Sequence, residues 1–240
     1  MSSLELVTLP AAFGLRNVSP FCVKAEMLLT ALDLPFTKSE IQDPRKAPKG
    51  KLPYLVDDGV VVADSELIAV HLDARTQGRV FGGLTPEQNA RGLAFTRLAE
   101  DHLYWLMVAS RWLDDGWWPN IVAGFFGFVP ALIRPLASNA ARRDVRRTLD
   151  LHGLGRHTRA EQEDFARRDL AALEAAVAQG GWIGGTDAPS VHDFAVAGLL
   201  STVYDQQPPT WLNPIAETFP ELRAYTERVQ AEVGVWARPV

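Results

Sequence analysis

The first 80 residues alternate short apolar runs with helical patterns. The apolar run 4–9 predicts a strand. Ser19-Pro20 predicts the start of a helix, because serine is a favoured N-cap and proline fits the first helical position. Apolar residues between positions 25 and 32 give this helix a broad buried side, and residues 35–40 predict a second strand.

A polar loop at 42–51 leads into a predicted β-hairpin. The apolar runs 52–56 and 60–63 flank Asp58-Gly59, and Asp-Gly between two such runs is a strong hairpin signal. Asp64-Ser65 then begins a helix with a high apolar content. The predicted order is therefore strand, helix, strand, loop, strand, strand and helix.

Only helical patterns follow a linker at 78–84. Capping signals at 85–88, 158–161 and 190–193 mark three helix starts, and the first opens a long helix toward Trp112. Further helices are expected at about 138–151 and 220–232. The pattern divides the chain into an α/β unit at residues 1–79 and an all-helical unit at residues 85–240.

One apolar segment interrupts the helical half. Residues 121–133 carry no charge and include Phe125, Phe126 and Phe128. The segment is well short of the roughly 20 residues that a membrane-spanning helix needs, and Pro130 interrupts it. We expect an apolar insertion around 117–137 that forms a buried helix or a lid, packed on the helical half or on a partner subunit. The alternative is a patch that binds a membrane surface or a partner.

Charge and cysteine content narrow the function classes. The 24 basic residues are outnumbered by 29 acidic ones, which argues against nucleic-acid binding, and the arginines at 142–147 fit one face of a solvated helix. The single cysteine, Cys22, cannot form an internal disulfide, so we expect a reducing, cytoplasmic setting. The five histidines form no metal-ligand pattern, so we expect no bound metal. The N-terminus resembles no secretory signal, and we expect no transmembrane segment.

Three short motifs carry a family resemblance. Ser19-Pro20-Phe21-Cys22, Gly50-Lys51-Leu52-Pro53 and Asp64-Ser65 resemble, in order and spacing, the N-terminal domain of glutathione transferases. This resemblance implies a thioredoxin-like α/β N-terminal domain that binds glutathione, followed by an all-α C-terminal domain. Ser190-Val191-His192-Asp193 resembles a capping box of the family's helical domain. The run 153–158, with Glu161 and Asp169-Leu170, is similar to the group that contains the metaxins and the failed-axon-connections proteins.

The resemblance makes Ser19 the catalytic position. A free thiol has a pKa of about 8.5, which must fall for the thiolate to form near neutral pH. A helix N-terminus favours an anion, and a hydroxyl adds a donor to the sulfur, so Ser19 can supply both effects. The alternative is that Ser19 is a helix cap only. Cys22, three residues later, is interpreted as a small buried residue, and a mixed disulfide with glutathione is the competing hypothesis.

The remaining motifs imply the glutathione contacts. By resemblance, Pro53 is cis and the main chain of Leu52 pairs with the cysteine of glutathione as an added strand would. Lys51 is a candidate for a glutathione carboxylate, or else a solvated loop lysine. Asp64 and Ser65 can read the γ-glutamyl end group, because the carboxylate accepts from its ammonium and the hydroxyl and helix start suit its carboxylate. A helix cap alone is the alternative.

These residues support an enzyme that conjugates glutathione, as co-substrate, to a hydrophobic electrophile, or a related glutathione-dependent reaction. The resemblance also implies a homodimer and a second-substrate site between the two halves. The alternatives are a non-catalytic binding or assembly module of metaxin type and a purely structural dimer. Aromatic residues are candidates for lining the second site: Phe13, Tyr104, Trp105, Trp112, Trp117, Trp118 and Phe125.

Overall fold

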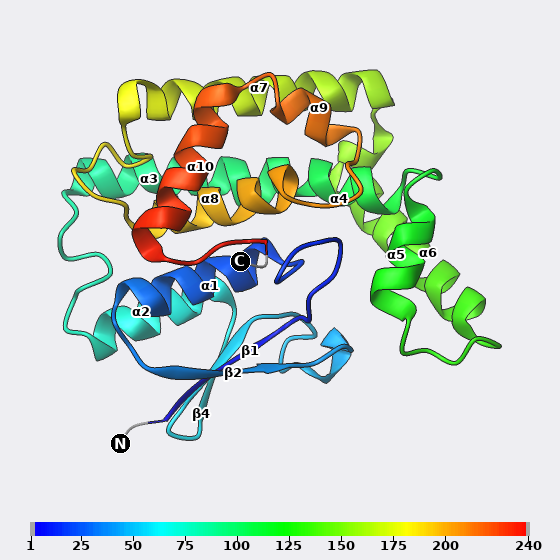
Figure 1. Cartoon of the computed structure of the whole chain (residues 1–240), viewed down its shortest axis with the longest axis horizontal. Helices are drawn as coiled ribbons and strands as arrows, with labels where there is room; N and C mark the ends of the chain where they lie inside the picture. Colours follow the sequence, from blue (N-terminus) through cyan, green and yellow to red (C-terminus); the bar gives the residue numbers. More distant parts are fainter. Residues whose placement is uncertain (1–2, 239–240) are drawn as a thin grey trace.

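The structure is a computed structural model in which residues 3–238 are described (Figure 1). The first half follows the predicted order element for element. It contains β1 (Leu4–Thr8), α1 (Pro20–Ala31), β2 (Phe36–Glu40), the 3₁₀ turn η1 (Pro44–Lys46), β3 (Tyr54–Asp57), β4 (Val60–Ala63) and α2 (Ser65–Arg75).

The strands form one mixed sheet in the order β2-β1-β3-β4. β1 is parallel to β2 and antiparallel to β3, and β3 is antiparallel to β4. Val7 pairs with Tyr54, and Tyr54 pairs with Ala63. The end of β1, the start of β3 and the end of β4 therefore meet at one edge of the sheet, which we call the β3-entry edge.

The second half is helical throughout, as expected. Its elements are α3 (Pro86–Arg97), the π-helical turn η2 (Leu98–Leu103), α4 (Tyr104–Trp112), α5 (Trp118–Phe126), α6 (Arg134–His152), η3 (Leu154–Arg156), α7 (Arg159–Val177), η4 (Ala178–Gly180), α8 (Val191–Tyr204), α9 (Leu212–Ala216) and α10 (Pro220–Val233). α3, η2 and α4 follow one another without a break and form the predicted long helix. Capping boxes are present at Thr85, Thr158 and Ser190, which confirms the three predicted starts.

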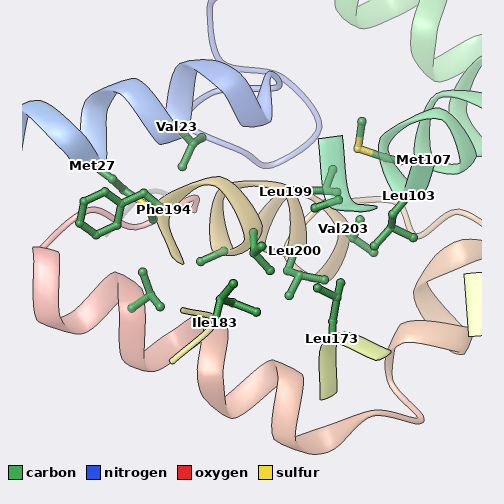
Figure 2. Close-up of a cluster of buried hydrophobic side chains, with 14 of the residues drawn as sticks. Val23, Met27, Leu103, Met107, Leu173, Ile183, Phe194, Leu199, Leu200 and Val203 are labelled. Atoms are coloured by element: carbon green, nitrogen blue, oxygen red, sulfur yellow. The ribbon is translucent and has the colours of Figure 1, made fainter. Parts of the chain in front are cut away.

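A shared hydrophobic core joins the two halves. α1 and α2 lie between the sheet and the helical layer in Figure 1. Every residue of α8 is buried, and α8 packs against α1. Figure 2 shows Met27 of α1 beside Phe194 of α8, while Leu103 of η2 and Leu173 of α7 lie toward the other end of α8, near Val203. Burying a side chain of this size contributes roughly 1.5–3 kcal/mol, so this contact firmly fixes the helix that carries Ser19.

The close contact of α8 with α1 depends on Gly198. A Cβ at this position would lie 3.0 Å from the carbonyl oxygen of Pro20 and 3.3 Å from the amide nitrogen of Lys24. Glycine therefore lets α8 approach the first turn of α1 directly. This approach positions the N-terminus of α1 against the helical half.

The expectation of a buried helix at 121–133 is wrong for most of the segment, while a lid and a contact with a partner subunit stay predictions. In α5 only Ile121 is buried, and the turn after α5 exposes apolar side chains, including Phe128, Leu132 and Ile133. The physical reason is that α5 packs on the rest of the protein through one side only. The turn around Pro130 extends past this contact, so its side chains stay exposed. α6 also begins at Arg134, four residues earlier than expected. Between residues 3 and 238, no helix has the length and apolar content to cross a membrane.

Candidate functional site

The three motif positions meet at the β3-entry edge. Ser19 follows the loop from β1, Pro53 precedes β3, and Asp64 follows β4. The Leu52-Pro53 peptide bond is cis, as the resemblance implied. The N–H of Asp64 donates to the carbonyl oxygen of Pro53 at 3.4 Å, so two of the motifs are joined directly.

Ser19 is held at the N-cap of α1 by Asn17. The N–H of Ser19 donates to Oδ1 of Asn17 at 2.9 Å, and Nδ2 of Asn17 donates to the carbonyl oxygen of Leu9 at 2.8 Å. Oγ of Ser19 accepts from the N–H of Cys22 at 3.4 Å. The Ser19 hydroxyl also lies within reach of the Cys22 sulfur, whose pKa it lowers, so the sulfur of a ligand would compete with Cys22 for its hydrogen. Nothing in the sequence pattern pointed to Asn17 beyond its place in a loop.

Cys22 lies in the core beneath this edge. Its side chain is fully buried and packs with Val7, Ala47 and Leu52. Burial raises the pKa of the Cys22 thiol to about 11. At neutral pH the group is therefore a protonated thiol, which agrees with its interpretation as a small buried residue. Its contact with Leu52 also ties the first turn of α1 to the loop that contains the cis proline.

Asp64 and Ser65 begin α2 with an uncommon backbone. Asp64 has φ +101°, a region that non-glycine residues rarely adopt and that is often found at ligand-binding sites. Its Oδ1 accepts from the N–H of Glu66 at 2.8 Å. Ser65 is buried, and its hydroxyl has no hydrogen-bond partner in the described part of the chain. A cap alone would use Asp64 and leave Ser65 without a role.

Lys51 lies on the turn before the cis proline. Its side chain is exposed, and it forms no ion pair with a carboxylate of residues 3–238. In the same loop Arg45 bonds Asp43 through Nε at 2.8 Å, whereas Lys46 and Lys49 form no ion pair within residues 3–238. The ammonium of Lys51 is thus available near Leu52.

A cluster of aromatic rings flanks the loop before Ser19. The ring of Phe13 lies edge-on to Trp117 and Phe125, with centroids 4.9 and 5.3 Å apart. Trp112 stacks on Phe125 at 5.8 Å and lies 6.0 Å from Trp118. A shallow cavity of about 500 Å³ adjoins this cluster and is lined by residues 11–14, Asn120, Ala123, Gly124, Gln207 and Pro208.

The aromatic candidates therefore separate into groups. Phe13 lines the cavity, whereas Trp112, Trp117, Trp118 and Phe125 form the cluster behind it. The close packing of α5 on Phe13 requires glycine at position 124, since a Cβ there would lie 2.5 Å from Cε1 of Phe13.

Two candidates lie outside this cluster, and one of them, Tyr104, lies against the Ser19 motif. Trp105 contacts His152, with ring centroids 5.3 Å apart. Tyr104 meets Phe21 at 4.9 Å. Burial raises the pKa of Tyr104, and its hydroxyl bonds to no group of residues 3–238.

Arg111 is a buried cation that sequence reasoning missed. Its Nη1 donates to the carbonyl oxygen of Val18 at 3.2 Å, which is the residue before Ser19. Its Nε donates to Gln206 Oε1 at 2.7 Å and its Nη2 to the Thr202 carbonyl oxygen at 2.9 Å. No carboxylate of the described chain pairs with it, and burial lowers its pKa to about 10. The guanidinium therefore stays positive at neutral pH. The sequence feature that could have identified Arg111 is that it is the one charged residue in the otherwise mostly apolar run 105–113.

A smaller cavity, of about 240 Å³, lies between α2, α3 and the start of α8. Its lining includes Glu66 but neither Ser19 nor Ser65. The site formed by the three motifs is therefore separate from this cavity.

Comparison with known proteins identifies the family. Residues 20–117 match the family described as glutathione S-transferase N-terminal domain. The isoprene-epoxide–glutathione S-transferase of Rhodococcus sp. strain AD45 is 31% identical, over 93% of this chain and 96% of its own length. The chain belongs to the glutathione S-transferase family. This membership confirms the thioredoxin-like α/β plus all-α fold and supports a glutathione-transferase-like function.

Other members of the glutathione S-transferase family are more distant. Failed axon connections of Drosophila melanogaster is 26% identical over 79% of this chain, which spans about half (47%) of that protein. The structure of a glutathione S-transferase from Methylobacterium radiotolerans, in complex with glutathione sulfonate, shares the fold at a TM-score of 0.60 with 16% identity, covering 99% of this chain and 97% of that one. The beta-etherase LigF of Sphingobium sp. strain SYK-6 does so at 0.62 with 19% identity, covering 95% of each chain.

Proposed function

We propose that this transferase conjugates glutathione to a hydrophobic electrophile, with Ser19 as its catalytic residue. The observation that carries the proposal is the position of the Ser19 hydroxyl at the start of α1, on the same edge as Pro53 and Ser65. A serine that acted only as a cap would need no such neighbours. The name of the Rhodococcus relative suggests a small epoxide as the electrophile.

Glutathione would bind across the β3-entry edge. The main chain of Leu52 would pair with the cysteine of the tripeptide, as a strand adds to a sheet. The Ser65 hydroxyl and the first N–H groups of α2 would hold the γ-glutamyl carboxylate, and Asp64 would accept from the adjacent ammonium. Lys51 would bond the other carboxylate of the ligand. Each of these groups is unpaired or only partly used in residues 3–238.

Three positive influences would favour the thiolate. The N-terminus of α1 carries a partial positive charge, and the Ser19 hydroxyl would donate to the sulfur. The buried charge of Arg111, bonded to the carbonyl oxygen of Val18, lies behind the same helix start. A cation in a poorly solvated site lowers the pKa of a nearby thiol, so Arg111 would act as an electrostatic and positioning residue.

The reaction would be a simple displacement. The thiolate sulfur forms a bond to the electrophilic carbon while the bond from that carbon to the leaving group breaks. In an epoxide the leaving oxygen stays attached and takes a proton from water. The cavity beside Phe13 would hold the electrophile, since Phe13 and Ala123 line it and the aromatic cluster lies behind it.

The remaining assignments also belong to the proposal. Residues 1–79 would form the glutathione-binding domain and residues 85–240 the helical domain. The protein would be a cytoplasmic homodimer. The likeness to Failed axon connections favours a second candidate, a non-catalytic binding or assembly module of metaxin type.

A pair of measurements separates the two candidates. The first is glutathione affinity by calorimetric titration, and the second is turnover with a generic aromatic electrophile and with a small epoxide. Binding with turnover is expected. Binding without turnover of any electrophile would favour the module, and absence of glutathione binding would reject the conjugating enzyme and leave the module.

A further inference from the structure

The turn between α5 and α6 presents an unusually exposed apolar tip. Leu132 is 95% exposed and Leu136 is 72% exposed, while Ile133 and Phe128 are 51% and 49% exposed. These residues are close together in the chain, over one turn and the first turn of α6. Grouped apolar side chains on a protein surface commonly mark an interaction site, whereas scattered ones need no explanation.

The tip belongs to a basic part of an acidic protein. Residues 118–152, which we call the α5–α6 arm, contain five arginines and two aspartates, although the whole chain has a net charge of −5. Two of the arginines serve the fold, since Arg134 bonds the carbonyl oxygen of Val129 and Arg142 bonds Asp115. The other three are exposed and form no ion pair or hydrogen bond with residues 3–238: Arg143, Arg146 and Arg147.

Helix geometry aligns the two kinds of side chain. Leu136, Arg143 and Arg147 are separated by seven and four residues, which places them on one face of α6. All three are exposed. This face of α6 therefore continues the apolar tip with positive charge.

We propose that the α5–α6 arm docks on an anionic lipid surface. The tip would enter the boundary between head groups and acyl chains, and Arg143 and Arg147 would bind the negative head groups, as in other basic amphipathic helices that lie on membranes. Long arginine side chains suit this position because the stem packs on apolar groups while the charge stays in the polar layer. The arm carries far too short an apolar run to span the bilayer.

The shape of the tip favours lipid over a second protein chain. A side chain that is 95% exposed, like Leu132, protrudes from the surface. Stable protein interfaces bury roughly 800 Å² on each partner and are closely packed, which a narrow projecting turn does not offer by itself. In Figure 1, α5 and α6 project from one side of the molecule, so the tip can reach a surface without obstruction.

Docking through the arm would also bring the membrane near the proposed second-substrate cavity. Asn120, Ala123 and Gly124 of α5 line that cavity. An apolar electrophile dissolved in the bilayer would then have a short path to the site.

Co-sedimentation with vesicles tests the proposal. The full chain is mixed with vesicles of phosphatidylcholine alone or with added phosphatidylglycerol, at low and high salt. We expect binding to the anionic vesicles that weakens with salt. Leu132→Asp combined with Ile133→Asp should reduce binding to the level of neutral vesicles. Arg143→Gln with Arg147→Gln should weaken it roughly thirtyfold, because each arginine near an anionic surface contributes about a fivefold factor.

Matched variants control for nonspecific effects. Val60→Asp with Val61→Asp changes another exposed apolar pair, and Arg79→Gln with Arg168→Gln removes two other exposed arginines. Both should bind vesicles like the wild type, and all variants should keep the wild-type thermal midpoint within a few degrees.

Three results would overturn the proposal. The first is a wild-type protein that binds no anionic vesicle, and the second is binding that both arm variants leave unchanged. The third is a wild-type dimer that the tip variant makes monomeric while vesicles bind neither protein, which would assign the tip to a second copy of the chain.

Discussion

The β3-entry edge and the α5–α6 arm both leave groups without partners, but of opposite kinds. At the edge, the groups open to a ligand are polar and lie in a tightly packed frame: Ser19 and Ser65 are both buried, and the Ser65 hydroxyl bonds to no other described residue. On the arm, the unused groups are apolar and arginine side chains in solvent. Hydroxyls at helix starts suit an anionic ligand, and apolar side chains grouped on a surface commonly mark an interaction site. Each region therefore indicates a ligand of matching chemistry.

The largest expected effect follows from removing the Ser19 hydroxyl. Ser19→Ala should lower kcat/KM by about 10²–10³, because a donor to a developing anion is lost. Glutathione affinity should change far less, since the ligand keeps its other contacts. The rate should also rise at higher pH than in the wild type, because the thiol pKa goes up. An unchanged rate and pH profile would reduce Ser19 to a helix cap.

The next effect concerns the end group of glutathione. Ser65→Ala and Asp64→Asn should each weaken glutathione about ten- to a hundredfold, the usual loss when a hydrogen bond to a charged group is removed. S-alkyl glutathiones should lose the same factor. Thr85→Ala is the matched control, because Thr85 caps α3 away from the edge. That variant should lose about 1 kcal/mol of stability and keep its affinity. Equal affinities for all three variants would leave Asp64-Ser65 as a cap.

A smaller effect should follow from the buried charge of Arg111. Arg111→Met keeps much of the volume and should raise the pKa of the bound thiol by roughly one unit, at the low end of the shift that a nearby opposite charge produces. Since the thiolate is the reactive form, the rate at pH 7 falls and recovers as the pH rises. Arg111→Lys should restore most of the pKa. If both variants lose stability equally and neither moves the pH profile, Arg111 serves only the packing.

The smallest expected effect is on activity after Cys22→Ala. The wild-type thiol, with its pKa raised to about 11 by burial, should react slowly with a thiol reagent below pH 9 and faster as the pH approaches 11. The alanine variant should keep its conjugating activity and lose about 1 kcal/mol of stability from the missing sulfur. Fast labelling of the folded protein at neutral pH would instead make Cys22 a reactive residue.

Local signals explain why the edge could be predicted from the sequence. The N-cap at Ser19, the Asp-Gly turn and the capping boxes are each fixed by residues within about four positions of one another. The order of strands then brings Ser19, Pro53 and Asp64 together, because β3 is antiparallel to both neighbours. The cis state of Pro53 came from the family resemblance alone.

Other features depend on contacts that a local pattern does not contain. Arg111 bonds Val18, Thr202 and Gln206, which lie between 91 and 95 positions away along the chain. Its environment is therefore set by how α4, α8 and the β1–α1 loop pack. The exposure of Leu132 could not be predicted either. An apolar residue is usually buried, but the local sequence does not show whether another part of the fold lies close enough to cover it.

The most direct test of the account is the pKa of glutathione bound to the wild-type protein. The thiolate absorbs in the ultraviolet and the thiol does not, so a pH titration of the difference spectrum of the complex reports this pKa. We expect a value one to two units below the roughly 8.5 of a free thiol, because Ser19, the start of α1 and Arg111 all favour the anion. A bound thiol that titrates at or above the free value would contradict the claim that the β3-entry edge activates glutathione.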